Sequence, residues 1–151
     1  MKIIVTSDLH KNIDYLNYIL YNYDADYYLD CGDSELSNYQ LKNFETVLGN
    51  CDYENYPRYL IKKIDENLKI FITHGHLYTI DQMIDIARNN YCKIILHGHT
   101  HVKKLEELEE LYIINPGSIT KPRSKESNTF LEIDYDQESL KLSFNFIKIT
   151  L

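Results

Sequence analysis

The sequence predicts a single domain of the α/β class, and three observations support this prediction. Short apolar runs bounded by polar loops alternate with segments whose apolar residues recur every three or four positions, as buried strands and amphipathic helices do. The chain has 151 residues, which is the size of one domain with one core. Polar clusters follow several of the predicted strands directly, as at the ligand-binding edge of an α/β sheet. We therefore interpret residues 1–151 as one domain.

The first half of the chain alternates between strands and helices. Residues 2–6 form a continuous apolar run, typical of a strand in the middle of a sheet. A helix is predicted from about Asn12, because Ile13, Leu16 and Ile19 recur at helical spacing. The further elements predicted in this half are strands at 27–29 and 44–48 and a short helix at 37–42 that begins at Ser37.

The second half contains one more helix and is otherwise rich in strands. Thr79 and Gln82 fit a capping box at the start of that helix. Leu142, Phe144 and Phe146 alternate with polar residues, as expected for a half-buried strand. The strands predicted in this half lie at 59–64, 68–73, 93–96, 112–114, 129–135 and 140–147.

Charge and cysteine content narrow the classes of function. The net charge of -7 argues against broad binding to a nucleic-acid backbone, which needs a basic face, but it leaves room for a small phosphate ester. Three cysteines without framework spacing favour a reducing compartment. Neither a signal peptide nor an apolar run of membrane-spanning length is recognisable. We expect a cytoplasmic protein that does not associate with a membrane.

Five polar clusters follow predicted strands and contain or adjoin all six histidines. Imidazole and carboxylate groups together suit borderline divalent ions such as manganese, iron, nickel or zinc. Each cluster alone is weak evidence, since an Asp-x-His pair is more often a turn than a pair of ligands, but the joint occurrence favours a metal site. The clusters are Asp8-x-His10, Gly32-Asp33, Gly49-Asn50-Cys51-Asp52, His74-Gly75-His76 and Gly98-His99-Thr100-His101.

The order of these motifs, with the later Asn115-Pro116-Gly117-Ser118 loop, resembles the calcineurin-like metallophosphoesterase superfamily. Within it, the chain is similar to the small single-domain phosphodiesterases of bacteria and archaea. The resemblance implies a four-layer αββα sandwich with two mixed β-sheets. It also implies a metal-dependent phosphoesterase, first of all a phosphodiesterase, that hydrolyses a small phosphate ester by in-line attack of a metal-bridging hydroxide.

The family pattern implies two divalent metal ions. Manganese is the first choice, and nickel, iron, zinc and magnesium are the alternatives. One ion would be bound by Asp8, His10, Asp33 and His101, and the second by Asp33, Asn50, His74 and His99. Asp33 would bridge the two ions, because each carboxylate oxygen can coordinate one of them.

The remaining candidate residues surround these ligands. Cys51, with Asp52 to orient it, stands where many phosphatases of the superfamily carry a histidine that protonates the leaving group. A thiol titrates near about 8.5 and is a weaker acid catalyst at neutral pH than imidazolium, so we expect modest turnover; the alternative is a small packed residue with no chemical role. His76 is a further catalytic candidate. Asn50, Ser118 and Arg123 are candidates for binding the substrate, although Ser118 and Arg123 also fit a tight turn followed by an exposed charge.

Two other functions compete with the hydrolase. The retromer subunit of the same superfamily resembles a scaffold: it binds protein partners, and its catalytic centre has decayed. An inactive or weakly active scaffold is therefore the main alternative. A nuclease is the third hypothesis, and the acidic charge argues against it. The sequence names neither the physiological substrate nor the native metal, and a homo-oligomer stays an open hypothesis.

Overall fold

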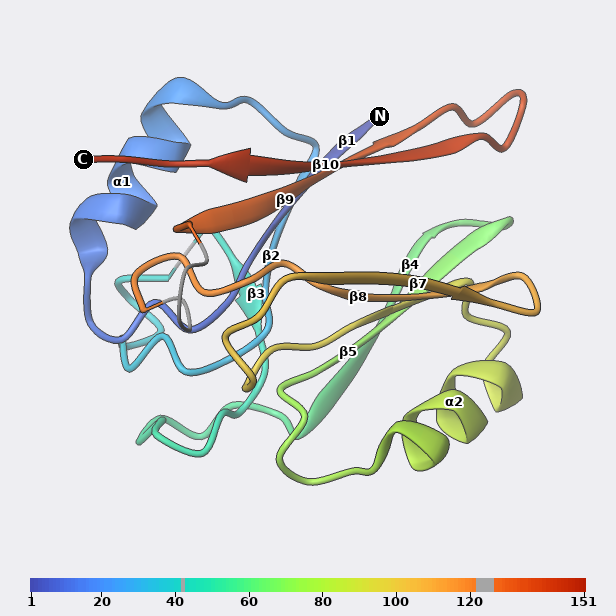
Figure 1. Cartoon of the computed structure of the whole chain (residues 1–151), viewed down its shortest axis with the longest axis horizontal. Coiled ribbons are helices and arrows are strands. Elements are labelled where there is room, and N and C mark those ends of the chain that lie inside the picture. The colour runs from blue at the N-terminus through green and yellow to red at the C-terminus, as the bar shows by residue number, and fades with distance from the viewer. Residues whose placement is uncertain (42, 122–126) are drawn as a thin grey trace.

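Two five-stranded β-sheets lie at the centre of the protein, with helix α1 (Ile13–Asn22) against one sheet and helix α2 (Ile80–Asn89) against the other (Figure 1). The computed structural model describes residues 1–41, 43–121 and 127–151. Sheet A has the strand order β10-β9-β1-β2-β3, and sheet B has the order β4-β5-β6-β8-β7. The strands of sheet A are β1 (Lys2–Thr6), β2 (Tyr27–Asp30), β3 (Glu45–Thr46), β9 (Thr129–Tyr135) and β10 (Leu142–Lys148). Those of sheet B are β4 (Tyr59–Asp65), β5 (Leu68–Thr73), β6 (Ile94–Leu96), β7 (Lys104–Leu108) and β8 (Leu111–Asn115).

Three hydrophobic clusters separate the four layers. Ile3 and Val5 of β1 point between the two sheets and belong to the central cluster, whereas Ile4 points outward and packs with Leu16 of α1. Helix α2 covers the outer face of sheet B through Met83 and its neighbours. Because β1 is buried on both faces, its sequence is a continuous apolar run instead of an alternating one. The αββα sandwich with two mixed sheets is thereby confirmed.

Six parallel strands bring the polar clusters to one edge of the molecule. β1, β2 and β3 are mutually parallel in sheet A, and β5, β6 and β8 are mutually parallel in sheet B. The loops that follow their carboxyl ends therefore leave each sheet on the same side. The two sets of loops meet in space, since His74 Nδ1 after β5 lies 2.8 Å from the carbonyl oxygen of Cys31 after β2.

Most predicted elements are present, but one predicted helix is a turn and one strand was not predicted. The predicted helix at 37–42 is a turn in its described residues: Ser37 and Gln40 exchange hydrogen bonds of the capping type, but these close one turn only. Strand β7 was not predicted, because Glu106, Glu107 and Leu108 are exposed and lack the alternation of a half-buried strand. Its strand conformation follows from its antiparallel pairing with β8 at the edge of sheet B.

Helix α2 confirms its predicted N-terminus. The Thr79 side chain accepts a hydrogen bond from the backbone N–H of Gln82, and the Gln82 side chain accepts one from the backbone N–H of Thr79. This capping box satisfies two of the backbone donors that a helix N-terminus otherwise leaves without a partner. It starts the helix six residues after His74, in the connection from β5 to β6.

Candidate metal centre

The loops after five parallel strands place the predicted metal ligands in one cluster. Within it, three sets of side-chain atoms lie within 4.8 Å of one another. They are the groups Asp8, His10 and His101; Asp8, Asp33 and His74; and His10, Asp33 and Cys51. Segments far apart along the chain therefore meet, as His10 Nε2 and His101 Nε2 do at 3.4 Å across 91 positions.

Asp8 and His74 form the buried floor of the cluster, since neither is accessible to solvent. Asp8 Oδ2 accepts hydrogen bonds from the Ser7 hydroxyl at 2.6 Å and from the backbone N–H of His99 at 3.2 Å. Among the described residues, Asp8 Oδ1 has no hydrogen-bond partner, although His101 Nε2 lies 3.2 Å from it. A buried carboxylate oxygen without a hydrogen bond is costly unless a cation neutralises it, so this oxygen fits a metal ligand.

Three histidines direct the same ring nitrogen into the cluster. His74 donates its Nδ1–H to the Cys31 carbonyl oxygen at 2.8 Å, and His101 donates its own to the Lys121 carbonyl oxygen at 2.6 Å. His10 donates Nδ1–H to Glu35 Oε2 at 3.0 Å. In a neutral ring each bond leaves the lone pair on Nε2, and such partners typically orient histidine ligands in metal sites. Without a metal, a His74 ring that carries both protons can also donate from Nε2 to Asp33.

Asn50 and His99 complete the second side of the cluster. Asn50 Oδ1 lies 3.1 Å from His74 Nε2 and 3.1 Å from His99 Nδ1. His74 Nε2 is in turn 3.2 Å from Asp33 Oδ2. An amide oxygen, a carboxylate oxygen and two imidazole nitrogens thus converge, which is a donor set that borderline divalent ions accept.

The backbone at the ligands adopts a conformation that ordinary residues avoid. Asp8, Asp33 and His99 have φ angles of 56°, 57° and 72°, and His10 and His101 have 47° and 61°. Residues other than glycine are uncommon in this left-handed region, and clusters of them occur at functional sites where the surrounding structure holds them. Five of the seven predicted ligands therefore have a conformation that the surrounding structure must hold.

Close approach explains two of the glycines in the motifs. A Cβ at Gly98 would overlap the Ser7 hydroxyl, and a Cβ at Gly49 would overlap Asp33 Oδ1. Both glycines are therefore required because another chain segment passes where a side chain would be. Each contact also joins two ligand loops.

The negative charges and the histidines shift one another's pKa. Burial would raise the pKa of Asp33, but hydrogen bonds from His74 and from the Cys51 backbone N–H lower it to about 2. Burial would lower the pKa of His74, but its hydrogen bond to Asp33 and the charge of Asp8 raise it above its usual value. Asp33 is therefore an anion at neutral pH, as a bridging ligand must be.

The candidate catalytic residues lie in different environments. Cys51 is exposed at the cluster, and limited burial with the charges of Asp33 and Glu35 raises the pKa of its thiol. The His76 ring lies edge-on to the His74 ring, with centroids 5.4 Å apart, and tilted to the His99 ring at 6.2 Å. Burial and the charges of the neighbouring histidines lower the pKa of His76. His76 is therefore neutral at pH 7 and adjoins the Asn50 side of the cluster.

Asp52 is directed at the backbone and not at the Cys51 side chain. Its Oδ2 accepts the backbone N–H groups of Asp33 and Gly49 at 2.9 and 2.8 Å, and its Oδ1 accepts that of Glu35 at 2.8 Å. One carboxylate thus connects the loop that carries Asp33 with the loop that carries Asn50. Asp52 therefore links two ligand loops through hydrogen bonds to their backbone.

One predicted substrate-binding residue, Ser118, has another position than expected. Ser118 is fully buried, and its hydroxyl donates to the Asp8 carbonyl oxygen and accepts the Lys121 backbone N–H. It has no exposed atom for a substrate, because the closing loop packs directly under the Asp8 loop. Arg123 lies outside the described residues. His97 is buried with its Nδ1 3.3 Å from the Gly98 carbonyl oxygen, and burial lowers its pKa.

Several residues that orient the ligands were not predicted. Glu35 contacts His10, and Ser7 donates to Asp8. The Cys31 and Lys121 carbonyl groups accept hydrogen bonds from His74 and His101, respectively. Any residue type can supply a carbonyl oxygen, so no sequence signal marks the last two. Glu35 is the exception, because an acid two residues after Asp33 is a recognisable signal for a partner of a histidine ligand.

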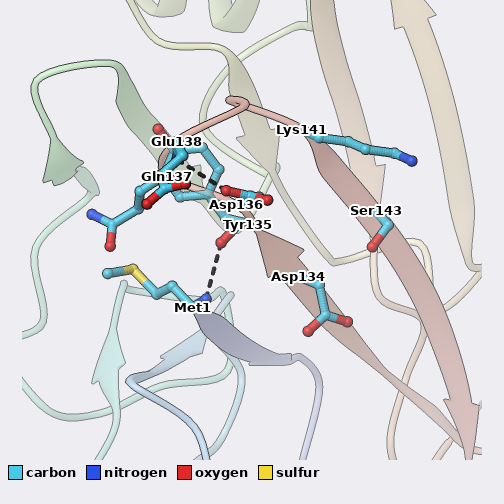
Figure 2. Close-up of a pocket in the computed structure, with 8 residues that line it drawn as sticks. All are labelled: Met1, Asp134, Tyr135, Asp136, Gln137, Glu138, Lys141 and Ser143. Carbon is cyan, nitrogen blue, oxygen red and sulfur yellow. Dashed lines mark hydrogen bonds between the residues drawn. The ribbon is translucent and has the colours of Figure 1, made fainter.

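A separate cavity of about 610 Å³ lies at the opposite edge of sheet A, where Met1 precedes β1 and Tyr135 ends β9 (Figure 2). The Met1 ammonium group donates to the Tyr135 carbonyl oxygen at 2.9 Å. The cavity is lined by Asp134, Asp136 and Glu138 among others. Lys141 and the Met1 ammonium group also line the cavity, so its charges are mixed, and the predicted metal ligands lie beyond the other end of β1.

The sequence was compared with protein families and with individual known proteins. The model of the calcineurin-like phosphoesterase superfamily domain matches residues 1–138. A probable metallophosphoesterase of Bacillus subtilis, YsnB, is 30% identical over an alignment of 152 positions, which covers 95% of this chain and 90% of that protein. A phosphodiesterase of Methanocaldococcus jannaschii is 28% identical over 141 residues, or 78% of this chain and 83% of that protein.

Solved structures agree with this assignment. A predicted phosphoesterase from Streptococcus pneumoniae superposes with a TM-score of 0.88 at 28% identity and covers 97% of this chain and 88% of that one. Vacuolar protein sorting 29 from Cryptosporidium parvum has a TM-score of 0.72 at 19% identity, with 98% of each chain covered, and shows the shared fold alone. The chain belongs to the calcineurin-like phosphoesterase superfamily. Within the described residues, neither helix is long and apolar enough to cross a membrane.

Proposed function

We propose that the protein is a phosphodiesterase that uses two divalent metal ions to hydrolyse a small phosphate ester. One observation carries the proposal: short distances link the seven predicted ligands to one another, and a buried carboxylate oxygen of Asp8 among them lacks a hydrogen bond within the described residues. Relatives named metallophosphoesterase and phosphodiesterase support the same class of reaction.

The distances favour the division of ligands into two groups. Asp8, His10 and His101 would hold one ion, because their ligand atoms lie within 4.8 Å of one another. His74 and Asn50 would hold the second ion together with His99, through atoms about 3.1 Å apart. Asp33 would bridge the ions. Its Oδ1 already accepts the Cys51 backbone N–H at 2.8 Å, but each carboxylate oxygen has a second lone pair for a metal.

The chemistry follows from the charge of this ligand set. Two divalent ions bound here would activate water as the nucleophile and stabilise charge on the phosphoryl oxygens during in-line displacement. Only Asp8 and Asp33 contribute carboxylates directly to the ligand set, so they offset half of the four positive charges. Glu35 and Asp52 are directed at His10 and at backbone amides instead. The remaining positive charge attracts an anionic ester.

Three residues at the rim would act on the substrate. The Asn50 side chain is exposed at the cluster and would contact a phosphoryl oxygen as well as the second ion. Cys51 would donate the proton to the leaving oxygen, and its raised pKa favours esters whose leaving group needs little protonation. His76, neutral at pH 7, would donate a hydrogen bond to the ester. Manganese is the proposed native ion, with nickel, iron, zinc and magnesium as alternatives.

The experiment is hydrolysis of bis-p-nitrophenyl phosphate by the purified protein with added manganese. We expect turnover that chelation abolishes and that Asp33→Asn also abolishes, because the amide removes the bridging charge. Asp85→Asn is the matched control, since Asp85 is exposed on α2. Activity that survives both chelation and Asp33→Asn would refute the two-metal mechanism.

The alternative is a scaffold of the same fold that binds protein partners. The likeness to vacuolar protein sorting 29 concerns the fold, so the ligand set discriminates between the two functions. The complete set of ligands favours the enzyme, because a decayed centre usually lacks one of them. Absence of turnover with each of the five metals across a panel of phosphoesters would favour the scaffold.

A further inference from the structure

Cys51 lies beside two of the proposed ligands of the first ion. Its Sγ, a nitrogen of His10 and a carboxylate oxygen of Asp33 all lie within 4.8 Å of one another. The thiol is exposed and therefore accessible to an ion that enters from solvent. Three atoms of types that bind metals thus face one point, and one of them is a sulfur.

The loop holds this sulfur in place relative to the other two atoms. The Cys51 backbone N–H donates to Asp33 Oδ1 at 2.8 Å, and the following residue, Asp52, accepts the backbone N–H groups of Asp33 and Gly49. Asn50 Nδ2 lies 3.5 Å from Cys51 Sγ and can donate to a thiolate. Only the single side-chain torsion of Cys51 remains to bring the sulfur toward an ion or away from it.

The chemistry of sulfur makes this position selective. Thiolate is a soft ligand that binds zinc and similar ions strongly, whereas manganese and magnesium prefer oxygen ligands. We propose that Cys51 is a conditional metal ligand, which joins His10 and Asp33 around a thiophilic divalent ion and stays uncoordinated when a hard ion is bound. On coordination the thiol loses its proton to solvent and forms one sulfur–metal bond. The inference rests on the proposed metal centre and names the class of ion that the centre would retain more tightly than manganese.

Coordination by Cys51 has a functional consequence. A catalytic metal site keeps one position open for water or substrate, whereas a site with every position filled by protein ligands is structural. A thiolate added to Asp8, His10, Asp33 and His101 would fill such a position. Thiophilic ions should therefore bind more tightly than manganese and support slower hydrolysis than manganese does, so that the rate would depend on the kind of metal available.

Cadmium tests the proposal without relying on activity, because a cadmium–thiolate bond gives an ultraviolet charge-transfer band. The full chain, freed of metal with a chelator, is titrated with Cd²⁺ alone. We expect the band to appear in the wild type and in Cys92→Ser and to be absent in Cys51→Ser. Cys92 is the matched control, since it is buried under α2. Cys31 is buried as well and is retained in every variant.

Affinities measured by calorimetry provide the second readout. Cys51→Ser should weaken Cd²⁺ binding by about tenfold or more, which corresponds to about 1.4 kcal/mol, and should change Mn²⁺ binding by less than about threefold. A band of wild-type intensity in Cys51→Ser, or equal Cd²⁺ affinities, would overturn the proposal. Failure of the wild type to bind Mn²⁺ would instead refute the proposed function, and a Cys51-dependent band in that same protein would still support cadmium coordination.

Discussion

Asp30 is a buried acid that should make the stability of this protein depend on pH. It ends β2 three residues before Asp33 and has no solvent-accessible surface. Its carboxylate accepts hydrogen bonds from the hydroxyls of Thr6 and Thr46 at 2.8 and 2.7 Å and from the backbone N–H of Gly32 at 3.0 Å. Burial outweighs these three bonds and raises the pKa of Asp30 to about 7.

The size and sign of the effect follow from the shift in pKa. A change from 3.8 to about 7 is worth about 4 kcal/mol at about 1.4 kcal/mol per pKa unit. The folded state keeps the proton at pH values where the unfolded state has lost it. The free energy of unfolding therefore falls as the pH rises from about 4 to about 7, and the loss is complete above about pH 7.

Asp30→Asn removes this titration while it keeps the shape of the side chain. The amide oxygen can keep the hydrogen bonds from the Thr46 hydroxyl and the Gly32 N–H, and the Thr6 hydroxyl can reverse direction to accept from the new amide NH2. We expect the free energy of unfolding of the variant to rise relative to wild type by about 3 kcal/mol between pH 5 and pH 8. Any constant cost of altered hydrogen bonds cancels from this difference.

Urea denaturation at pH 5, 6, 7 and 8, in the presence of a chelator, measures the effect. The chelator is needed because bound ions near Asp30 would add a pH-dependent stabilisation of their own. Asp85→Asn serves again as the control and should follow the wild type at every pH. If the difference between Asp30→Asn and wild type were the same at pH 5 as at pH 8, Asp30 would be ionised throughout and the reasoning from burial would be wrong.

Two further predictions concern residues that hold the ligands in place. Glu35→Ala should weaken Mn²⁺ binding by roughly 10- to 100-fold in calorimetry, because His10 loses the partner that selects its tautomer. Glu35→Gln should lose less Mn²⁺ affinity, because an amide oxygen still accepts the Nδ1–H. Equal affinities of wild type and Glu35→Ala would contradict that role. Asp52→Asn should lower the free energy of unfolding by about 1–3 kcal/mol in urea, because the new amide group faces a backbone N–H that it cannot accept. Unchanged stability would show that these bonds contribute little.

Local patterns predicted most of the secondary structure. The capping box at Thr79 and the buried run of β1 depend on neighbours in sequence, so they could be recognised without the fold. The segment at Ser37 has similar local signals, yet it forms a turn. Tyr56 donates its hydroxyl to the Leu36 carbonyl oxygen at 2.5 Å, a contact between residues 20 positions apart that the local pattern does not contain.

The role of a site residue was harder to predict than its position. The order of the motifs indicated Asp8, His10 and Asp33 as ligands, and they lie together as expected. Ser118 and Asp52 also lie beside the ligand loops, but their polar atoms are directed at the backbone of those loops. A hydroxyl or carboxylate in a motif has the same sequence signal whether it faces a substrate or a peptide group.

The sequence by itself predicted the layers of the fold, the family and a set of side chains able to bind metals, because each depends on residue type and order. The tertiary structure decided how those side chains are held. Carbonyl groups from Cys31 and Lys121 orient two histidine rings, and the surrounding structure holds the left-handed backbone at five of the predicted ligands. It also placed the Cys51 thiol beside His10 and Asp33, two of the proposed metal ligands. These features arise from contacts between distant segments, and only the folded chain brings those segments together.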